Sequence, residues 1–349
     1  MGGHNLDNAL VKKMDYNSNL HKSLSIDRVV ETYGEWTAMS IYLGDDQYTL
    51  MPGKVDYRLR RLVQVASDLV GKPLNQIRVL DLACLEGHYG IEFALHGSEV
   101  VGIEIREANL EKARFAKHHL KLDNLYLYQD DVRNLSKEKY SSFDLVLCSG
   151  MLYHLKPPDV FQFVKNIYEV CERVVLFDTF ISLSDRKSVE FEGKTYWGLD
   201  YVEHPEEATA EDKKRDLWAS IDNTISLWMT HASLSNLVAH VGFTSFYECY
   251  VPTMPNNPTD RKTYVAIKGK PVKLLSSPVT EQTPHVDIPE NEPKKVHPAQ
   301  IKRSPIFQFV KKTFPQPVKD MIKPVLRSLR LLEQDQTPEF LKKQAKSDK

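Results

Sequence analysis

The sequence predicts a doubly wound α/β fold, built on a mostly parallel sheet of seven strands that ends in an antiparallel hairpin. From about residue 78 onward, short apolar runs alternate with amphipathic segments, as strands alternate with crossover helices in a parallel sheet. Near residue 260, two apolar runs are joined by a Pro- and Asn-rich turn that is too short for a crossover. The 349 residues are therefore expected to hold one such domain, at 71–270, with appendages on both sides.

The first strand is the apolar run Val79–Leu82, which leads directly into a turn that contains Gly87. Residues 91–95 then have helical spacing, and the next apolar run, 99–105, carries Glu104. Strand, glycine turn, helix, strand and acidic residue form the layout of a nucleotide-binding βαβ unit, in which the carboxylate holds a ribose diol. This stretch therefore predicts a nucleotide site.

The alternation continues after this unit and is interrupted once. Further strands are expected at 125–132, 143–150, 173–180, 246–251 and 264–268, and further helices at 107–120, 160–171 and 234–241, while a helix at 55–70 precedes the first strand. The interruption, residues 181–229, is rich in aromatic residues and is expected to be irregular. A long irregular segment between a strand and the next helix is more often functional than a linker, so it is interpreted as a substrate insertion.

The appendages differ in composition from the domain. Residues 1–70 form an N-terminal extension whose aromatic segment, 35–50, is expected either to fold over the site as a lid or to pack into the core. Residues 271–300 are rich in Pro, Ser, Thr, Glu and Lys and predict a disordered linker. Residues 301–333 form a basic amphipathic tail that indicates reversible contact with an anionic membrane surface, the alternatives being a partner-docking helix or a cover on the domain's own sheet. The polar terminus spans 334–349.

The composition excludes several classes of protein. A formal net charge of -1 gives no overall attraction to nucleic acid, so any such affinity must be local. The four cysteines are far apart and lack metal-ligand spacing, which predicts a reduced protein without a bound metal. The first residues lack the pattern of a signal peptide, and no apolar run has bilayer length. A cytoplasmic protein is expected, with the tail as its contact with the inner face of a membrane.

Over residues 78–269 the chain resembles class I S-adenosylmethionine-dependent methyltransferases. Asp81 and Gly87 match the first motif, whose loop wraps the amino-acid end of the cofactor, and Glu104 matches the acidic residue on the ribose. Asp131 and the residue after it match the pair beside the adenine. The resemblance implies S-adenosylmethionine as the cofactor. It also implies a set of cofactor-binding residues: Asp81, Ala83, Cys84, Gly87, Glu104, Asp131, Val132, Ser149 and Gly150.

The first motif departs from the family at two of its three glycines. The family has glycine where this chain has Ala83, Leu85 and Gly87, and only the last is kept. The loop is therefore expected to differ from the usual path at the first two positions. A dinucleotide dehydrogenase is the competing interpretation, but the chain lacks GxGxxG and a second nucleotide-binding half.

Three residues are candidates for catalysis. Methyl transfer is an in-line displacement, so alignment supplies much of the rate and a base is needed only for a weak nucleophile such as a hydroxyl. His154 follows the fourth strand and is the candidate base, or else it caps the turn at Pro157 or packs beneath the cofactor. Tyr153 lines the pocket or holds the cofactor carboxylate. Asp178 ends the fifth strand, at the sheet edge where ligands bind, and contacts acceptor hydroxyls or fixes the loop behind it.

A more detailed resemblance is to the tRNA wobble-uridine carboxymethyl-transferring enzymes. It is carried by Leu152–His154, by Trp36 in the aromatic extension, and by Asn223 leading to Gly242–Phe243. Binding of tRNA needs a basic surface, whereas the run 203–207 adds acid to the insertion. A small-molecule or glycan acceptor, such as a sugar or glycolipid intermediate, is therefore favoured over nucleic acid. The alternatives are a tRNA-modifying transferase and, because of the lost glycines, a non-catalytic S-adenosylmethionine-binding protein.

Overall fold

The computed structural model of the protein describes residues 25–37, 39–50, 56–270 and 286–290. The predicted membrane-contacting tail at 301–333, the polar terminus at 334–349 and most of the predicted linker lie outside these ranges. Among the described helices, none combines the length and the apolar character needed to cross a membrane.

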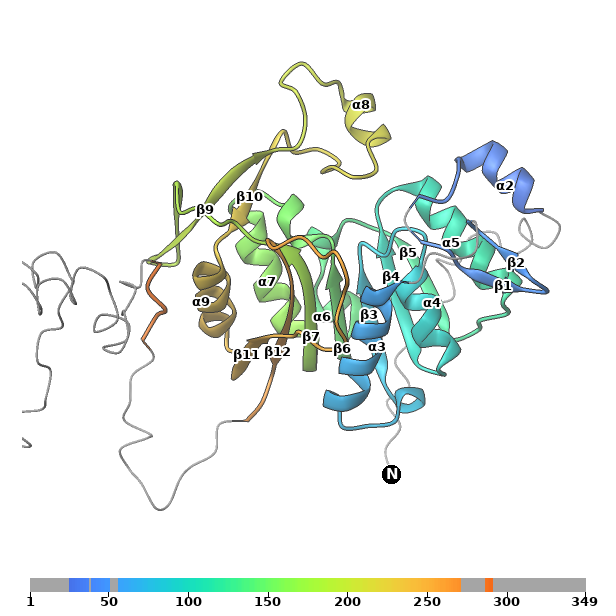
Figure 1. Ribbon diagram of the computed structural model, residues 1–349, viewed down its shortest axis with the longest axis horizontal. Helices are drawn as coiled ribbons and strands as arrows, with labels where there is room; N and C mark the ends of the chain where they lie inside the picture. Colours follow the sequence, from blue (N-terminus) through green and yellow to red (C-terminus); the bar gives the residue numbers. More distant parts are fainter. Residues whose placement is uncertain (1–24, 38, 51–55, 271–285, 291–349) are drawn as a thin grey trace, which may run out of the picture. The chain divides into compact units, whose positions relative to one another are not determined.

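A seven-stranded sheet forms the centre of the domain, in the order β11-β12-β7-β6-β3-β4-β5 (Figure 1). Its strands are β3 (Arg78–Leu82), β4 (Glu99–Glu104), β5 (Leu125–Gln129), β6 (Phe143–Ser149), β7 (Cys171–Phe180), β11 (Ser245–Glu248) and β12 (Arg261–Ile267). Strand β12 is antiparallel to both of its neighbours, and the strands from β7 to β5 are parallel. The predicted fold class and the C-terminal hairpin are confirmed.

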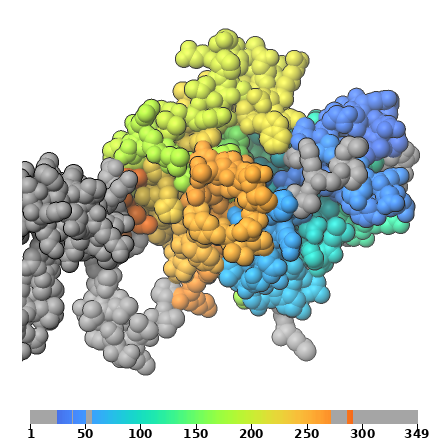
Figure 2. Space-filling model, in the orientation of Figure 1, coloured from blue at the N-terminus to red at the C-terminus, as the bar shows by residue number. Residues whose placement is uncertain are grey.

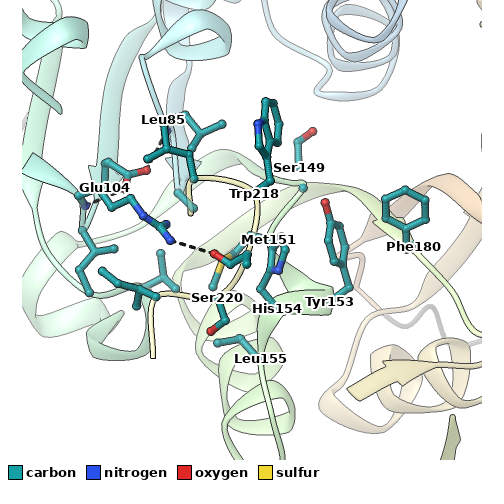
Figure 3. A pocket seen from close by; sticks show the side chains of 18 of the residues that line it. Leu85, Glu104, Ser149, Met151, Tyr153, His154, Leu155, Phe180, Trp218 and Ser220 are labelled. Carbon is teal, nitrogen blue, oxygen red and sulfur yellow. Dashed lines mark hydrogen bonds between the residues drawn. The ribbon is translucent and has the colours of Figure 1, made fainter. Parts of the chain in front are cut away.

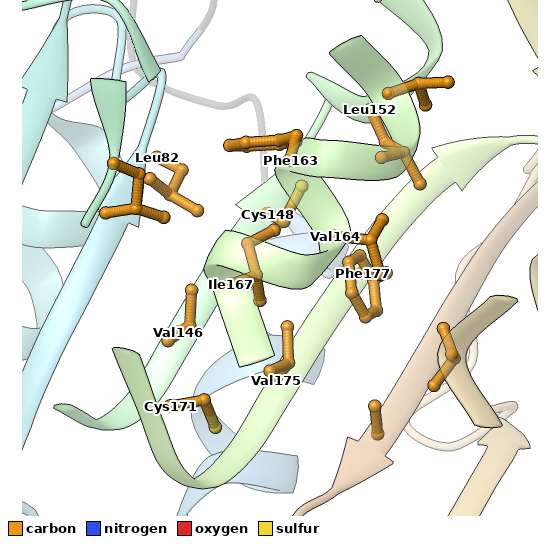
Figure 4. Packing of buried hydrophobic residues seen from close by; sticks show 14 of the residues in the cluster. Leu82, Val146, Cys148, Leu152, Phe163, Val164, Ile167, Cys171, Val175 and Phe177 are labelled. Atoms are coloured by element: carbon orange, nitrogen blue, oxygen red, sulfur yellow. The ribbon is translucent and has the colours of Figure 1, made fainter. Parts of the chain in front are cut away.

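Alternate residues of each strand face opposite layers of helices, because successive side chains of a strand point to opposite sides of the sheet. The helices are α3 (Tyr57–Leu69), α4 (His88–Leu95), α5 (Glu107–His119), α7 (Asp159–Val170) and α9 (His231–Val241). Leu80 and Leu82 belong to the cluster that includes α7, whereas Val79 belongs to the cluster that includes α3, α4 and α5. Figure 4 shows α7 packing on β6 and β7 through Phe163 and Ile167.

The insertion at 181–229 is folded, so the expectation of an irregular segment was wrong. It forms a three-stranded antiparallel sheet and a short helix: β8 (Lys187–Phe191), β9 (Lys194–Val202), β10 (Ile225–Met229) and α8 (Ala210–Arg215). Glu192 and Gly193 join β8 to β9, with φ of 49° and 75°, the positive values that a tight two-residue hairpin requires. Buried Tyr196, Leu227 and Met229 join the insertion to the core. Figure 2 shows its side chains, yellow-green to yellow, as a continuous part of the surface.

The N-terminal extension packs on the domain through α2 (Ile26–Tyr33), β1 (Tyr42–Gly44) and β2 (Gln47–Tyr48). Trp36 is 2% exposed, and its ring lies 5.9 Å from that of Phe115 on α5. The fully buried Lys112 donates to Glu86 Oε1 at 2.7 Å and to the Glu35 carbonyl at 2.8 Å. Of the two roles predicted for the aromatic segment, the structure therefore shows core packing for Trp36, while Met39 reaches the cavity described below.

Residues 286–290 belong to the predicted linker but are bonded to α9. The main chain of Ile288 exchanges two hydrogen bonds with the Asn236 side chain, at 2.8 and 2.9 Å. The Glu290 carboxylate accepts hydrogen bonds from Thr230 at 2.6 Å and from Ser233 at 2.5 Å, at the start of α9. These five residues are therefore fixed on the helix.

Candidate active site

A cavity of about 450 Å³ lies at the carboxyl ends of the parallel strands, with the insertion on its opposite side (Figure 3). Such positions bind ligands in open α/β sheets because the strand order reverses there and leaves a crevice. Of the residues predicted for the site, those that line the cavity are Ala83, Glu104, Asp131, Val132, Ser149, Gly150, Tyr153 and His154. Those that do not line it are Asp81, Cys84, Gly87 and Asp178.

The loop after β3 keeps the left-handed turns that glycine favours, although two of the glycines are absent. The φ values are 52° at Ala83, 47° at Leu85 and 81° at Gly87. A left-handed conformation costs a non-glycine residue about 1–2 kcal/mol, so the loop holds two strained positions. The loop was expected to differ from the usual path at the first two positions, but Ala83 and Leu85 both have the positive φ that glycine adopts there. What changes is the cavity wall, which gains the two side chains.

Two buried carboxylates, Glu104 and Asp81, hold the backbone around this loop. Glu104 accepts hydrogen bonds from the Leu85 amide at 3.0 Å and from the Arg106 amide at 2.8 Å, and burial raises its pKa. Asp81 accepts from the Gly90 amide at 2.9 Å, and burial raises the pKa of Asp81 to about 7. Asp81 therefore acts behind the loop, on helix α4, while Glu104 faces the cavity.

These residues fit an adenosine. Each oxygen of Glu104 accepts one backbone N–H, and Asn109 also contacts the carboxylate; a carboxylate has about four acceptor positions, so Glu104 can accept a ribose hydroxyl as well. Ile105 and Val132 add apolar surface to the same end of the cavity for a flat base. The third strand ends earlier than predicted, at Gln129, and Asp131 instead caps a short 3-10 turn and pairs with Arg133.

His154 is held by a carboxylate from the insertion. Its Nδ1 lies 3.0 Å from both oxygens of Glu203, a buried residue 49 positions further along the chain. Glu203 also accepts from Ser226 Oγ at 2.5 Å and from the Ser220 amide at 3.0 Å. Burial acts to raise the pKa of Glu203, but these bonds and the neighbouring histidine hold it below its usual value. Because an ionised carboxylate only accepts, Nδ1 is the nitrogen that carries the proton in the neutral imidazole, and Nε2 is then the nitrogen that can accept one.

Aromatic rings form the wall beside this dyad. Trp228 is stacked between Tyr201, at 4.3 Å between ring centroids, and Phe180, at 4.9 Å. Tyr153 meets Phe180 and Trp228 edge-on, at 5.0 and 5.7 Å, and lies 4.3 Å from the ring of His154. Burial raises the pKa of Tyr153, so its hydroxyl stays protonated near neutral pH. All four aromatic residues line the cavity, and Tyr153 therefore contributes to its wall.

Asp178 is occupied by other side chains. It is fully buried and binds Arg58 Nε at 3.0 Å, Arg261 Nε at 2.7 Å and Thr263 Oγ1 at 2.8 Å. Both arginines line the cavity, whereas Asp178 does not. This geometry favours the second of its predicted alternatives, a residue that positions its surroundings rather than one that contacts the acceptor.

Sequence reasoning missed the residues that reach the cavity from distant segments. Glu203 stands in an acidic run that is typical of a solvated surface, and no spacing connects it to His154. Arg58 comes from the N-terminal extension and Arg261 from β12, about two hundred residues later, and both bind Asp178. The sequence could have indicated Trp228 as part of a cavity wall, since it is a tryptophan in a segment next to the site. It could not have indicated that Trp228 stacks between Tyr201 and Phe180.

Comparison with known proteins agrees with this arrangement. Residues 74–213 match the family described as "Methyltransferase domain". The chain is 30% identical over 118 residues to a ubiquinone biosynthesis O-methyltransferase of Acinetobacter baylyi, covering 34% of this chain and 45% of that protein. It is 33% identical over 118 residues to the Proteus mirabilis protein of the same name, covering 34% and 43%. The chain thus matches less than half the length of these relatives.

A solved structure extends the likeness in fold. The N-terminal domain of EvdMO1, determined in the presence of SAH and D-fucose, superposes with a TM-score of 0.53 at 20% identity. The match covers 70% of this chain and 94% of that one. Residues 74–213 therefore match a methyltransferase domain, and the sheet order agrees with the Rossmann-like fold of S-adenosylmethionine-dependent methyltransferases.

Proposed function

We propose that this protein transfers a methyl group from S-adenosylmethionine to a hydroxyl oxygen of a small or medium acceptor, with a sugar or glycolipid intermediate as the favoured class. The observation that carries the proposal is the His154–Glu203 pair, joined at 3.0 Å, in which His154 lines the same cavity as Glu104. A base held in one tautomer has a use in methyl transfer when the acceptor is a weak nucleophile such as a hydroxyl.

The chain's own residues divide the work of the reaction. When bound, S-adenosylmethionine supplies a methyl group on a sulfonium, which leaves as a neutral thioether. His154 Nε2 takes the proton of the acceptor hydroxyl as the oxygen forms its bond to the methyl carbon and the carbon–sulfur bond breaks. Glu203 stabilises the imidazolium that results, and Glu104 holds the ribose so that methyl and acceptor stay in line.

The acceptor class is supported by the aromatic wall and by the relatives. Tyr201, at one end of the stack with Trp228, offers a flat apolar surface in the cavity wall for the face of a hydroxylated ring. The curated relatives are named O-methyltransferases, and the EvdMO1 domain was determined with D-fucose present. Glu206 and Glu207 are exposed and would repel a nucleic-acid backbone, whereas Glu203 of the same run is buried and would not. Because this leaves fewer exposed acidic residues than the run contains, tRNA is kept as the alternative acceptor.

The test is a transfer assay with methyl-labelled S-adenosylmethionine and a panel of nucleotide sugars, glycolipids, phenols and tRNA. We expect label on an ether oxygen of a sugar-containing acceptor, and its loss in His154→Gln. The matched control, His96→Gln, changes an exposed histidine at the end of α4 and should keep full activity. Label on tRNA alone, or full activity of His154→Gln, would contradict the proposal.

Reversible membrane contact through residues 301–333 is part of the same proposal, because glycolipid acceptors lie at membranes. Flotation with anionic vesicles compares the full chain with one that ends at residue 269. Flotation of the full chain alone supports the contact, and equal, negligible flotation of both contradicts it.

A further inference from the structure

One segment of the insertion, residues 214–222, lies between the ribose end of the cofactor site and the His154–Glu203 pair. We infer that Arg106 is a positioning residue that holds this segment closed over the bound cofactor and thereby keeps Glu203 aligned on His154. The inference rests on the proposed function, because it assigns Arg106 a role in the same reaction. According to this inference, closure of residues 214–222 both strengthens cofactor binding and aligns His154.

Arg106 connects the ribose carboxylate to the insertion. Its amide donates to Glu104 Oε1 at 2.8 Å, directly after β4. Its guanidinium donates to the carbonyls of Asp216 and Ala219, both at 2.9 Å, and of Lys214 at 3.4 Å. A guanidinium has several donors in a fixed plane, so one side chain can hold successive carbonyls of a loop. Figure 3 shows Glu104 and two residues of the segment, Trp218 and Ser220, around the same cavity.

A second arginine holds the other end of the same segment. Arg133 Nη2 donates to Asp222 Oδ2 at 2.7 Å, while its Nε bonds Asp131 at 2.9 Å. Asp131 and Arg133 follow β5, at the adenine end of the predicted site. The segment is therefore fastened at both ends to the part of the domain that faces adenosine.

The residue next to the Arg106 contact supports the catalytic pair. The Ser220 amide donates to Glu203 Oε2 at 3.0 Å, and the Ser220 carbonyl lies 2.6 Å from His204 Nε2. The Asn223 amide donates to Ser220 Oγ at 3.2 Å, and the Asn223 side chain donates to the His154 carbonyl at 3.0 Å. Movement of the segment would therefore remove the Ser220 bond to Glu203, and it would also remove the Ser220 support of Asn223, which bonds His154.

Cofactor binding beside Glu104 should therefore be coupled to the alignment of the His154–Glu203 pair. Residues 217–222 line the same cavity as Glu104, so a ligand bound there contacts the closed segment. Anything that stabilises the closed segment favours both cofactor binding and the aligned pair, and the coupling in binding free energy is reciprocal. Loss of Arg106 should thus weaken cofactor affinity and, at saturating cofactor, still lower kcat.

The experiment compares Arg106→Ala, Arg106→Lys and the control Arg215→Ala, an exposed arginine of α8 that lies within the same segment. Calorimetry measures the Kd of S-adenosylhomocysteine, hydrogen exchange follows the amides of residues 214–224 with and without that ligand, and steady-state assays give kcat at saturating cofactor. For Arg106→Ala we expect about a tenfold or greater rise in Kd, loss of the ligand-induced protection, and about a tenfold or greater fall in kcat. Arg106→Lys should recover part of each effect, and Arg215→Ala should match the wild type.

The outcomes separate the two claims. Wild-type protein that binds S-adenosylhomocysteine without protecting residues 214–224 would overturn the closure and leave the proposed function standing. A variant Arg106→Ala with a raised Kd but unchanged kcat would overturn the link to Glu203. Absence of binding in the wild type would overturn the proposed function itself, and the inference with it. The binding and exchange measurements do not depend on knowing the acceptor.

Discussion

Replacing Glu203 by glutamine tests the catalytic pair directly. The amide keeps the volume of the carboxylate but turns one oxygen into a donor. In the structure both oxygens accept, from His154 Nδ1, Ser226 Oγ and the Ser220 amide. A glutamine accepts at only one of the two positions and carries no charge, so it holds the Nδ1-protonated tautomer less strongly and does not stabilise the imidazolium that forms when Nε2 takes a proton.

The expected magnitude follows from what a positioned base contributes. General base catalysis supplies about 10²–10⁴ in rate, so we expect Glu203→Gln to lower kcat by about 10²–10³, which corresponds to about 3–4 kcal/mol. The folded state should also lose about 1–3 kcal/mol, because a donor of Ser220 or Ser226 is left buried without an acceptor.

The assay is steady-state transfer of labelled methyl at saturating cofactor, with thermal unfolding measured alongside. The matched control, Glu206→Gln, changes an exposed glutamate of the same run and should alter neither quantity. A Glu203→Gln protein that remains folded and keeps kcat within about threefold of the wild type would refute the reasoning, because the pair would then be structural.

Three further changes test the loop and the aromatic wall. Burial raises the pKa of Asp81 to about 7, so the folded state keeps a proton that the unfolded state releases at lower pH. The free energy of unfolding should therefore fall as pH rises from 5 to 7, by up to about 1.4 kcal/mol per pH unit. Asp81→Asn should remove this slope in urea titrations, and an unchanged slope would contradict the reasoning. Ala83→Gly should raise the free energy of unfolding by about 0.5–1 kcal/mol, because glycine adopts a φ of 52° without strain. The control Ala94→Gly, inside α4, should lower the free energy of unfolding by about 0.5–1 kcal/mol. Destabilisation by both substitutions would show that the loop is unstrained. In Gly198→Ala the new Cβ would lie 2.2 Å from the Trp228 carbonyl, so we expect the free energy of unfolding to fall by about 1–3 kcal/mol. The KM for the acceptor should rise with little change in the Kd for the cofactor. An unaltered acceptor KM would argue against the aromatic wall as the acceptor site.

The fold could be predicted because its signals are local. The alternation of apolar runs, the turn at Gly87 and the carboxylate of Glu104 all lie within short windows, and the parallel sheet follows from their order. The insertion was misread because β8 and β9 are largely exposed, which hides their alternation among polar residues. The Glu192–Gly193 turn was the signal that could have identified the hairpin.

The candidate site was predictable only on its cofactor side. Residues there follow strands directly, so position along the chain determines their place in space. Glu203 reaches His154 through the pairing of β9 with β10, and Arg106 reaches Ala219 across more than a hundred residues. Such contacts depend on tertiary packing, which one sequence does not encode in any spacing. Asp178 shows the converse, since its place at a strand end was predicted but its two arginine partners were not.

Calorimetric titration with S-adenosylhomocysteine tests the central claim most directly, because it asks whether the cavity beside Glu104 is a cofactor site. We predict saturable binding at one site, weakened about tenfold or more in Glu104→Ala through loss of the acceptors for the ribose hydroxyls. The control Glu99→Ala changes a carboxylate at the opposite end of the same strand, and it should leave the affinity unaltered. Absence of binding by the wild type, or equal affinity in the Glu104→Ala protein, would contradict the account.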